Sequence, residues 1–367
     1  MIIHTDCRFF EGSKPCKQHK REGVVCESCN YYEPVSYRIL IIKLDSMGDV
    51  LRTTSLLPAL KENFPASALS WVTRRESVDL ILGNPLIDEI LIFETNAVYH
   101  LLARIFDLVL GLDATKDSAA LCSLSRGNEK LGFGLDPSGA IFPVNQAARE
   151  WFYIGLNDEL KKKNRKSYQQ IMFEICNVPA AGFHLPQLYL TENEAAFGRV
   201  FLVQNGVDLT KPVIGLNTGS GSRWELKSLP LSALIKIIER LKVNFQVVLL
   251  GGPQEQEKNE NLSRLTGALD TGCNNSLREF AGIVNQCSLV ISGDTLALHI
   301  ALALQKKIVA FFGPTSPYEI ELSLLGEKYF APLDCISCYH PSCQKTPNCM
   351  ELIKVDDIIS AAERLMT

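Results

Sequence analysis

Short apolar runs alternate with amphipathic stretches along most of this chain. The run RILIIKL (38–44) is rich in β-branched and apolar residues and has the length of a buried strand. A polar turn, DSMGD (45–49), follows it, and VLRTTSLLPALKENF (50–64) then places apolar side chains at helical spacing. The pattern predicts a strand, a loop and a helix, which is the start of a βαβ unit.

The same pattern recurs in both halves of the chain. Further strands are predicted at 68–73, 88–93, 106–113, 212–219, 246–252, 288–294 and 307–313. Residues 145–190 are more polar, and we interpret them as a connection whose charge run, KKKNRK (161–166), is a solvated helix face. An amphipathic helix is predicted at 353–366, and we expect it to cross back onto the first half.

Two successive α/β halves with parallel sheets are therefore the expected fold. A chain of 367 residues, 46% of them hydrophobic, can bury two cores of ordinary size. We place a Cys-rich extension at 1–36, an acceptor domain at 37–190, a nucleotide-sugar domain at 191–330, and a Cys-rich segment with the final helix at 331–367. Ligands of such folds bind in the crevice at the carboxyl ends of the strands.

Composition narrows the classes of partner. The net charge is −4 and the charges of both signs are interspersed, which disfavours binding to nucleic acid. No stretch approaches the roughly 20 apolar residues that span a bilayer, and the first residues do not resemble an export signal. We expect a cytoplasmic protein that reaches the inner membrane only peripherally, through its substrate.

Four loops after predicted strands carry candidate chemistry. In the first, Gly48 allows close backbone approach to an anion at the helix start, beside Ser46 and Asp49; Asp and Ser are also ordinary helix caps there. The second loop offers Thr218, Ser220 and, as counter-charge for phosphate, Lys227 or Arg223.

The other two loops are shorter. In the third, Asp294 and Thr295 precede a helix that contains His299, which is equally well explained as a core histidine. In the fourth, Glu255 follows a Gly-rich strand end, where a carboxylate suits a ribose diol or simply a helix start.

Together these loops resemble glycosyltransferase family nine, the heptosyltransferases that move a sugar from a nucleotide donor onto lipopolysaccharide or related acceptors. The resemblance covers roughly 37–320. It is carried by IIKLDSMGDVLRTTSLLPALKENFP (41–65), NPLIDEIL (84–91), VVLLGGPQE (247–255), the run from LVISGDT to HIALAL (289–304) and VAFFGPTSP (309–317).

The resemblance implies a GT-B fold and an inverting transfer in which Asp49 is the general base. It assigns Lys227 to donor phosphate, Glu255 to the ribose, and Asp294, Thr295 and His299 to the donor, with no catalytic metal. The family's best known donor is ADP-heptose. Because Leu296 stands where the family commonly has glycine, another nucleotide sugar is an open alternative. The acceptor is also open: lipopolysaccharide core, another glycan or a protein side chain.

Eight of the twelve cysteines gather near the two ends, with C-x-x-C pairs at Cys26–Cys29 and Cys335–Cys338. The two sets are Cys7, Cys16, Cys26 and Cys29, and Cys335, Cys338, Cys343 and Cys349. Four thiolates suit a structural zinc, an iron or an iron–sulfur cluster and leave no open catalytic position. Free thiols or a disulfide are the alternatives. The segment 334–350 also resembles the iron-holding cysteine finger of autotransporter heptosyltransferases.

Two other functions fit parts of the sequence. One is a metal-bearing interaction or redox protein on an inactive transferase fold. The other, an NAD-dependent dehydrogenase, would require G-x-G-x-x-G at the first strand–helix turn, where this chain has DSMGD. The sequence makes no prediction of oligomeric state.

Overall fold

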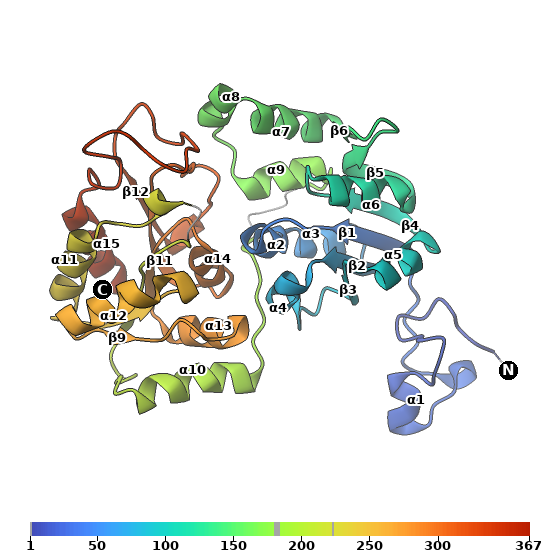
Figure 1. Cartoon of the computed structure of the whole chain (residues 1–367). Helices are drawn as coiled ribbons and strands as arrows, with labels where there is room; N and C mark the ends of the chain where they lie inside the picture. Colours follow the sequence, from blue (N-terminus) through green and yellow to red (C-terminus); the bar gives the residue numbers. More distant parts are fainter. Residues whose placement is uncertain (1, 180–183, 222–223) are drawn as a thin grey trace.

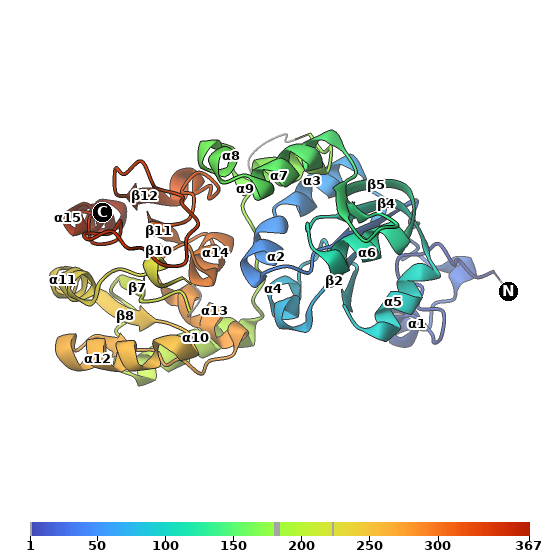
Figure 2. The same ribbon diagram turned by 45° about the horizontal axis from the view of Figure 1, so that its top comes forward.

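Two α/β domains lie side by side in the computed structural model, which describes residues 2–179, 184–221 and 224–367 (Figures 1 and 2). The first sheet has the strand order β3-β2-β1-β4-β5-β6, and the second has the order β12-β11-β10-β7-β8-β9. Neighbouring strands run parallel, except that β5 and β6 are antiparallel. The expected pair of parallel α/β halves is confirmed.

The eight predicted strands are all present. They are β1 (Tyr37–Ile42), β2 (Ser67–Thr73), β3 (Glu89–Ile92), β4 (Ile105–Gly111), β7 (Val213–Asn217), β8 (Gln246–Leu250), β10 (Leu289–Gly293) and β11 (Lys307–Phe312). The sequence analysis missed β5 (Arg126–Leu135), β6 (Ile141–Pro143), β9 (Leu269–Asp270) and β12 (Gly326–Phe330). These four lie at or next to the sheet edges, where a strand needs no continuous apolar run.

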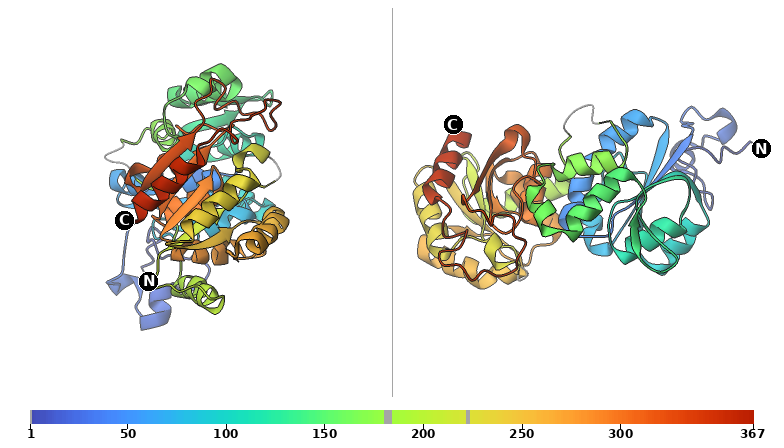
Figure 3. Two further views of the ribbon diagram at one scale, coloured as in Figure 1. Left: turned by 90° about the vertical axis from the view of Figure 1, so that its left-hand side faces the viewer. Right: turned by 90° about the horizontal axis from the view of Figure 1, so that it is seen from above.

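Helices cover both sheets (Figure 3). In the first half they are α2 (Met47–Thr53), α3 (Leu56–Asn63), α4 (Val78–Ile81), α5 (Thr95–Leu102), α6 (Lys116–Leu124), α7 (Gln146–Leu156), α8 (Asp158–Lys163) and α9 (Tyr168–Ile175), and α1 (Lys17–Glu22) precedes them in a segment apart from the sheet. In the second half they are α10 (Glu192–Gln204), α11 (Leu231–Leu241), α12 (Gln256–Thr266), α13 (Leu277–Gln286), α14 (Leu296–Ala303) and α15 (Val355–Met366).

Two expectations about helices are wrong. Residues 145–190 are more than a connection, because Ile171 and Met172 of α9 are buried in the same hydrophobic cluster as Ile39 and Ile41 of β1. The final helix does not cross back to the first domain. Instead α15 packs against α11 and the second sheet, because its apolar face is buried there in one hydrophobic cluster with their side chains.

The domains meet through the helices that follow their central strands. Leu51 of α2 is fully buried in one cluster with Leu298 of α14, and the two helices face each other across the boundary (Figure 2). This contact brings the loop after β1 against the loop after β10. The two carboxyl edges therefore enclose a common space.

Residues 2–36 stand apart from this body, at the end of the first domain that is farthest from the second (Figures 1 and 3). None of the four hydrophobic core clusters contains a residue from this segment, and α1 buries no side chain. Arg8 anchors it, because one guanidinium nitrogen pairs with Asp88 and another donates to the Ser67 carbonyl at 3.0 Å.

The helices in the described parts of the chain are all too short or too polar to cross a membrane.

Candidate active site

A cleft of about 770 Å³ lies between the carboxyl edges of the two sheets and is lined by residues of both domains. Its walls include nearly all of the predicted site residues: Ser46, Gly48, Asp49, Ser220, Lys227, Glu255, Asp294, Thr295 and His299. Thr218 is not among them, because it is fully buried and its hydroxyl bonds to Asn259. Arg223 lies outside the described residues.

Asp49 sits in the first turn of α2, where the loop after β1 ends. Ser46 is the helix cap, because its hydroxyl accepts from the Asp49 N–H at 3.3 Å and also donates to the Asp49 carboxylate at 3.0 Å. Asp49 is thus not the cap itself. Its carboxylate, with 26% of the side chain exposed, faces the cleft.

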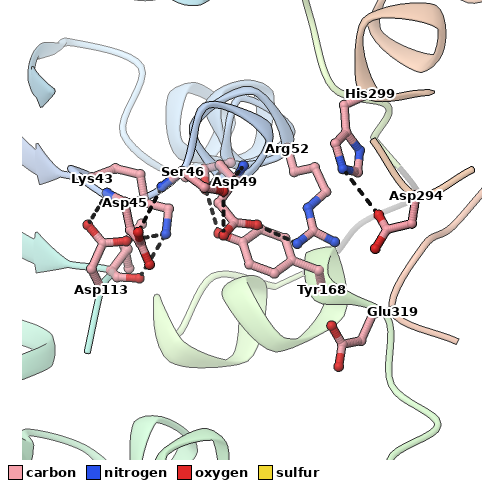
Figure 4. Close-up of polar contacts among 12 residues, drawn as sticks. Lys43, Asp45, Ser46, Asp49, Arg52, Asp113, Tyr168, Asp294, His299 and Glu319 are labelled. Carbon is pink, nitrogen blue, oxygen red and sulfur yellow. Dashed lines mark hydrogen bonds and ion pairs between the residues drawn. The ribbon is translucent and has the colours of Figure 1, made fainter. Parts of the chain in front are cut away.

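Arg52 is a member of this site that the sequence analysis missed. Its guanidinium pairs with Asp49 and lies 3.9 Å from the ring centroid of Tyr168, which comes from α9 (Figure 4). Burial raises the pKa of Asp49, but the charges of Arg52 and Lys43 outweigh burial and hold that pKa well below its usual range. Asp49 is therefore ionised at pH 7.

A buried ion pair fixes the loop that carries Asp49. Lys43, which follows β1, pairs with Asp113, which follows β4, because these strands are neighbours in register. Asp113 also accepts from the backbone N–H groups of Leu44 at 2.5 Å and Asp45 at 3.2 Å. One carboxylate thus holds both the lysine and the start of the loop (Figure 4).

The opposite wall carries a second set of charges. Lys227 Nζ lies 2.9 Å from Asp294, whose other oxygen is 3.7 Å from His299 Nε2. Burial and then the nearby Arg52 charge lower the pKa of His299 to about 3, so its imidazole is neutral at pH 7. Gly48 is needed here, because a Cβ at this position would lie 2.7 Å from the His299 ring.

The glycine-rich loops of the second domain are tied together by Glu255. Its carboxylate accepts from the backbone N–H groups of Gly221 and Gly252, both at 2.9 Å, and a Cβ on Gly219 would lie 2.4 Å from it. Ser220 donates its hydroxyl to the Trp224 carbonyl at 2.7 Å. These contacts hold the glycine-rich loops in place along the cleft, which Lys227 also lines.

A family model for glycosyltransferase family 9 (heptosyltransferase) matches residues 97–348. This range covers more than half of the chain and includes the whole second wall of the cleft. The chain belongs to glycosyltransferase family 9. It is accordingly a glycosyltransferase, as the resemblance of its loops predicted.

Individual relatives of this family 9 enzyme are distant. Lipooligosaccharide heptosyltransferase 2 of Haemophilus influenzae is 25% identical over 318 residues, which are 76% of this chain and 84% of that protein. A family 9 glycosyltransferase from Veillonella parvula has the same fold, with a TM-score of 0.72 at 19% identity over 90% of this chain and 97% of that one. These likenesses confirm the GT-B fold.

One further structural neighbour is an iron-containing enzyme. TibC of enterotoxigenic E. coli, described as a dodecameric iron-containing heptosyltransferase in complex with ADP-D-beta-D-heptose, superposes with a TM-score of 0.55 at 13% identity. The match covers 90% of this chain and 77% of TibC.

The cysteines of this family 9 enzyme form two separate groups. Cys7, Cys16, Cys26 and Cys29 line one pocket of about 490 Å³ in the N-terminal segment. The second group lies around Cys349 and contains Cys335, Cys338 and Cys343. Burial, and then the charges of these three neighbours, raise the pKa of Cys349 to about 11. All eight are free thiols. Within the described ranges no three potential ligands converge in a geometry that would hold a metal ion.

Proposed function

We propose that this enzyme transfers a glycosyl group, heptose in the first instance, from a nucleoside-diphosphate donor such as ADP-heptose to an acceptor hydroxyl with inversion at the anomeric carbon. The observation that carries the proposal is the contact of Gly48 with His299. It sets the Asp49 loop of one domain directly against the Lys227–Asp294 wall of the other. A base and an anion-binding wall then face the same space.

Asp49 acts as the general base. As the acceptor oxygen attacks the anomeric carbon, its proton passes to the Asp49 carboxylate and the bond to the departing phosphate oxygen breaks. The lowered pKa of Asp49 supports this role, because a base must begin deprotonated. The pairing with Arg52 keeps the carboxylate in one orientation.

Charge on the departing diphosphate needs stabilisation that exists before the reaction. Lys227 is the candidate, since its ammonium lines the cleft and now neutralises Asp294. Backbone N–H groups of the glycine-rich loops and the neutral His299 complete that wall. We assign the ribose to the Glu255 end of the cleft, which Leu296 also lines.

The donor is tested with a panel of nucleotide sugars that includes ADP-heptose, ADP-glucose, UDP-glucose and GDP-mannose. We expect donor-dependent release of ADP from ADP-heptose and weak or no turnover of the others. Lys227→Met should raise the donor KM about 10- to 100-fold, because one charge-assisted contact to phosphate is lost. Lys258→Met is the control, since Lys258 does not line the cleft and its ammonium donates to the Thr218 carbonyl at 3.2 Å and to the Ser228 hydroxyl at 3.0 Å. Absence of turnover with every donor would contradict the proposal.

For the acceptor we propose a hydroxyl of a lipid-linked glycan, in line with the lipooligosaccharide transferase that is similar to this chain. Transfer would then occur in the cytoplasm at the inner membrane surface. Analysis of the product in the same assay would identify an alternative acceptor, which is either another glycan or a protein hydroxyl.

We propose in addition that each cysteine set holds a structural metal, zinc or iron. Two observations support this: the four N-terminal cysteines line one pocket, and the four C-terminal cysteines lie near one another. Binding of a metal ion would draw the thiolates of each set together. Protein purified without oxygen should contain about one metal per set by elemental analysis. Cys26→Ser with Cys29→Ser should remove only the metal of the N-terminal set. Metal-free protein under these conditions would overturn the idea.

A further inference from the structure

The segment 335–349, called the cysteine loop below, reaches the transfer cleft. Tyr339, between its second and third cysteines, is one of the residues that line the cleft together with Asp49 and Asp294. Neither the family motifs nor the strand pattern pointed to it. The loop therefore contributes to the site as well as to the surface.

The Tyr339 side chain is held on three sides. Its hydroxyl donates to Glu319 at 2.8 Å and accepts from the Ser316 N–H at 3.3 Å. The Lys161 ammonium lies 3.6 Å from the centroid of its ring. Lys161 belongs to α8 of the first domain, so the ring of Tyr339 contacts both domains. The charge run at 161–166 is therefore more than a solvated helix face.

The backbone of the cysteine loop is built to present this residue. Ser337 and Tyr339 both have left-handed φ angles, 61° and 54°, which cost free energy for residues with a Cβ. Two bonds to the turn after β11 hold them, from Ser337 N to the Gly313 carbonyl at 3.3 Å and from Tyr339 N to the Pro314 carbonyl at 2.8 Å. Such strain at a cleft residue is typical of a functional position.

The cysteines support the same turn. A Cβ on Gly313 would lie 2.9 Å from Cys349 Sγ, so the end of the loop packs directly on the residue that bonds to Ser337. Lys345 donates to Cys335 at 3.3 Å and, through its backbone, to Cys343 at 3.4 Å. The thiols thus connect the two ends of the loop on either side of Tyr339.

The position within the cleft indicates which part of a donor would meet this residue. Glu319, its hydrogen-bond partner, is within electrostatic reach of Arg52 and Asp294, which belong to the catalytic and phosphate ends. The nucleoside end, at Gly251, Gly252 and Glu255, follows β8, which is two strands away from β10 and Asp294 in the second sheet. The group between the phosphate and Asp49 is the sugar that is transferred.

We propose that Tyr339 forms the wall against which the glycosyl group of the donor is positioned, and that the cysteine loop acts on transfer by placing this side chain. The proposal rests on the proposed function, since it takes a nucleotide sugar as the ligand. An aromatic ring suits this task, because it is rigid and offers a large apolar face with one polar end.

The test compares binding of ADP-heptose with binding of ADP, which lacks the sugar, by calorimetry. Tyr339→Leu should weaken ADP-heptose binding about 5- to 10-fold, the scale of one aromatic contact, and leave ADP binding unchanged. Tyr339→Phe keeps the ring and should bind ADP-heptose as the wild type does. If Tyr339→Leu bound ADP-heptose normally, or lost ADP equally, the proposal would be wrong.

Tyr318 provides a matched control for a role in domain contact alone. Its ring lies 4.1 Å from the Arg165 guanidinium of the first domain, in an arrangement like that of Lys161 on Tyr339, but it does not line the cleft. Tyr318→Leu should leave the ratio of the two affinities unchanged. An equal loss of ADP-heptose affinity in Tyr339→Leu and Tyr318→Leu would mean that Tyr339 contributes only to the contact between the domains.

The contribution of the thiols is tested separately. Cys335→Ser with Cys343→Ser should weaken ADP-heptose binding selectively, as Tyr339→Leu does. Cys7→Ser with Cys16→Ser removes as many thiols at the far end of the molecule and should have no such effect (Figure 1). Equal binding of ADP-heptose by both double variants would show that the thiols of the cysteine loop do not act on the position of Tyr339. Wild-type protein that binds ADP but not ADP-heptose would instead contradict the proposed donor.

Discussion

Asp49→Asn is expected to lower the rate of transfer about 10²- to 10⁴-fold, the range that general acid–base catalysis contributes. Asparagine fills the same space and keeps a hydrogen-bond acceptor for Arg52 and Ser46, whose bonds define this position. It cannot take the acceptor's proton. Donor affinity should therefore change little, because Lys227 and the glycine-rich loops are untouched.

The measurement is kcat by product release, beside the donor Kd by calorimetry. Asp45→Asn is the matched control, since Asp45 lies in the same loop but is exposed and outside the cleft. It should transfer at close to the wild-type rate. Retained turnover in Asp49→Asn would show that another group removes the proton, and a parallel loss of donor binding would show that Asp49 serves binding instead.

Asp113→Ala is expected to destabilise the protein by about 3–5 kcal/mol, which is the usual cost of leaving one member of a buried ion pair without its partner. Both Lys43 and Asp113 are at most 3% exposed. The change also removes the acceptor for the N–H groups of Leu44 and Asp45, so the start of the Asp49 loop loses its anchor. Transfer activity should fall together with stability.

Urea unfolding followed by fluorescence and by circular dichroism measures this effect, with both probes needed because the chain has two domains. Asp117→Ala is the control. Asp117 pairs with Arg74 at 2.8 Å, but both side chains are about half exposed, and such pairs contribute little. If Asp113→Ala lowered the free energy of unfolding by less than about 1 kcal/mol, Lys43 would have to bind water or another partner in the variant.

The local pattern of apolar and polar residues was enough to predict the central strands and the loops that follow them. A strand buried on both faces is a continuous apolar run, and the polar turn after it must lie at the carboxyl edge of a parallel sheet. The loops with Asp49, Lys227 and Asp294 were therefore predictable as neighbours of one cleft. Edge strands such as β12 were not, because their residues are only half buried and lack that run.

Residues that act through distant partners were also missed. Arg52 and Tyr168 are 116 positions apart in number and carry no motif, yet they stack because α9 packs on α2. The same holds for Lys43 and Asp113, which meet only through the register of β1 and β4. Sequence spacing cannot show such contacts, because they depend on which elements become neighbours after folding.

Local sequence patterns were sufficient to predict two Rossmann-like halves, the similarity to family 9 glycosyltransferases, and the positions of the candidate base and phosphate-binding residues. These features follow from short-range patterns of apolar residues, glycine and charge. The folded structure was needed to show that Ser46 rather than Asp49 caps α2, that Arg52 pairs with Asp49, and that Tyr339 of the cysteine loop lines the cleft. Each of these depends on packing between segments far apart in the chain, and packing is decided by shape and burial that no local pattern records.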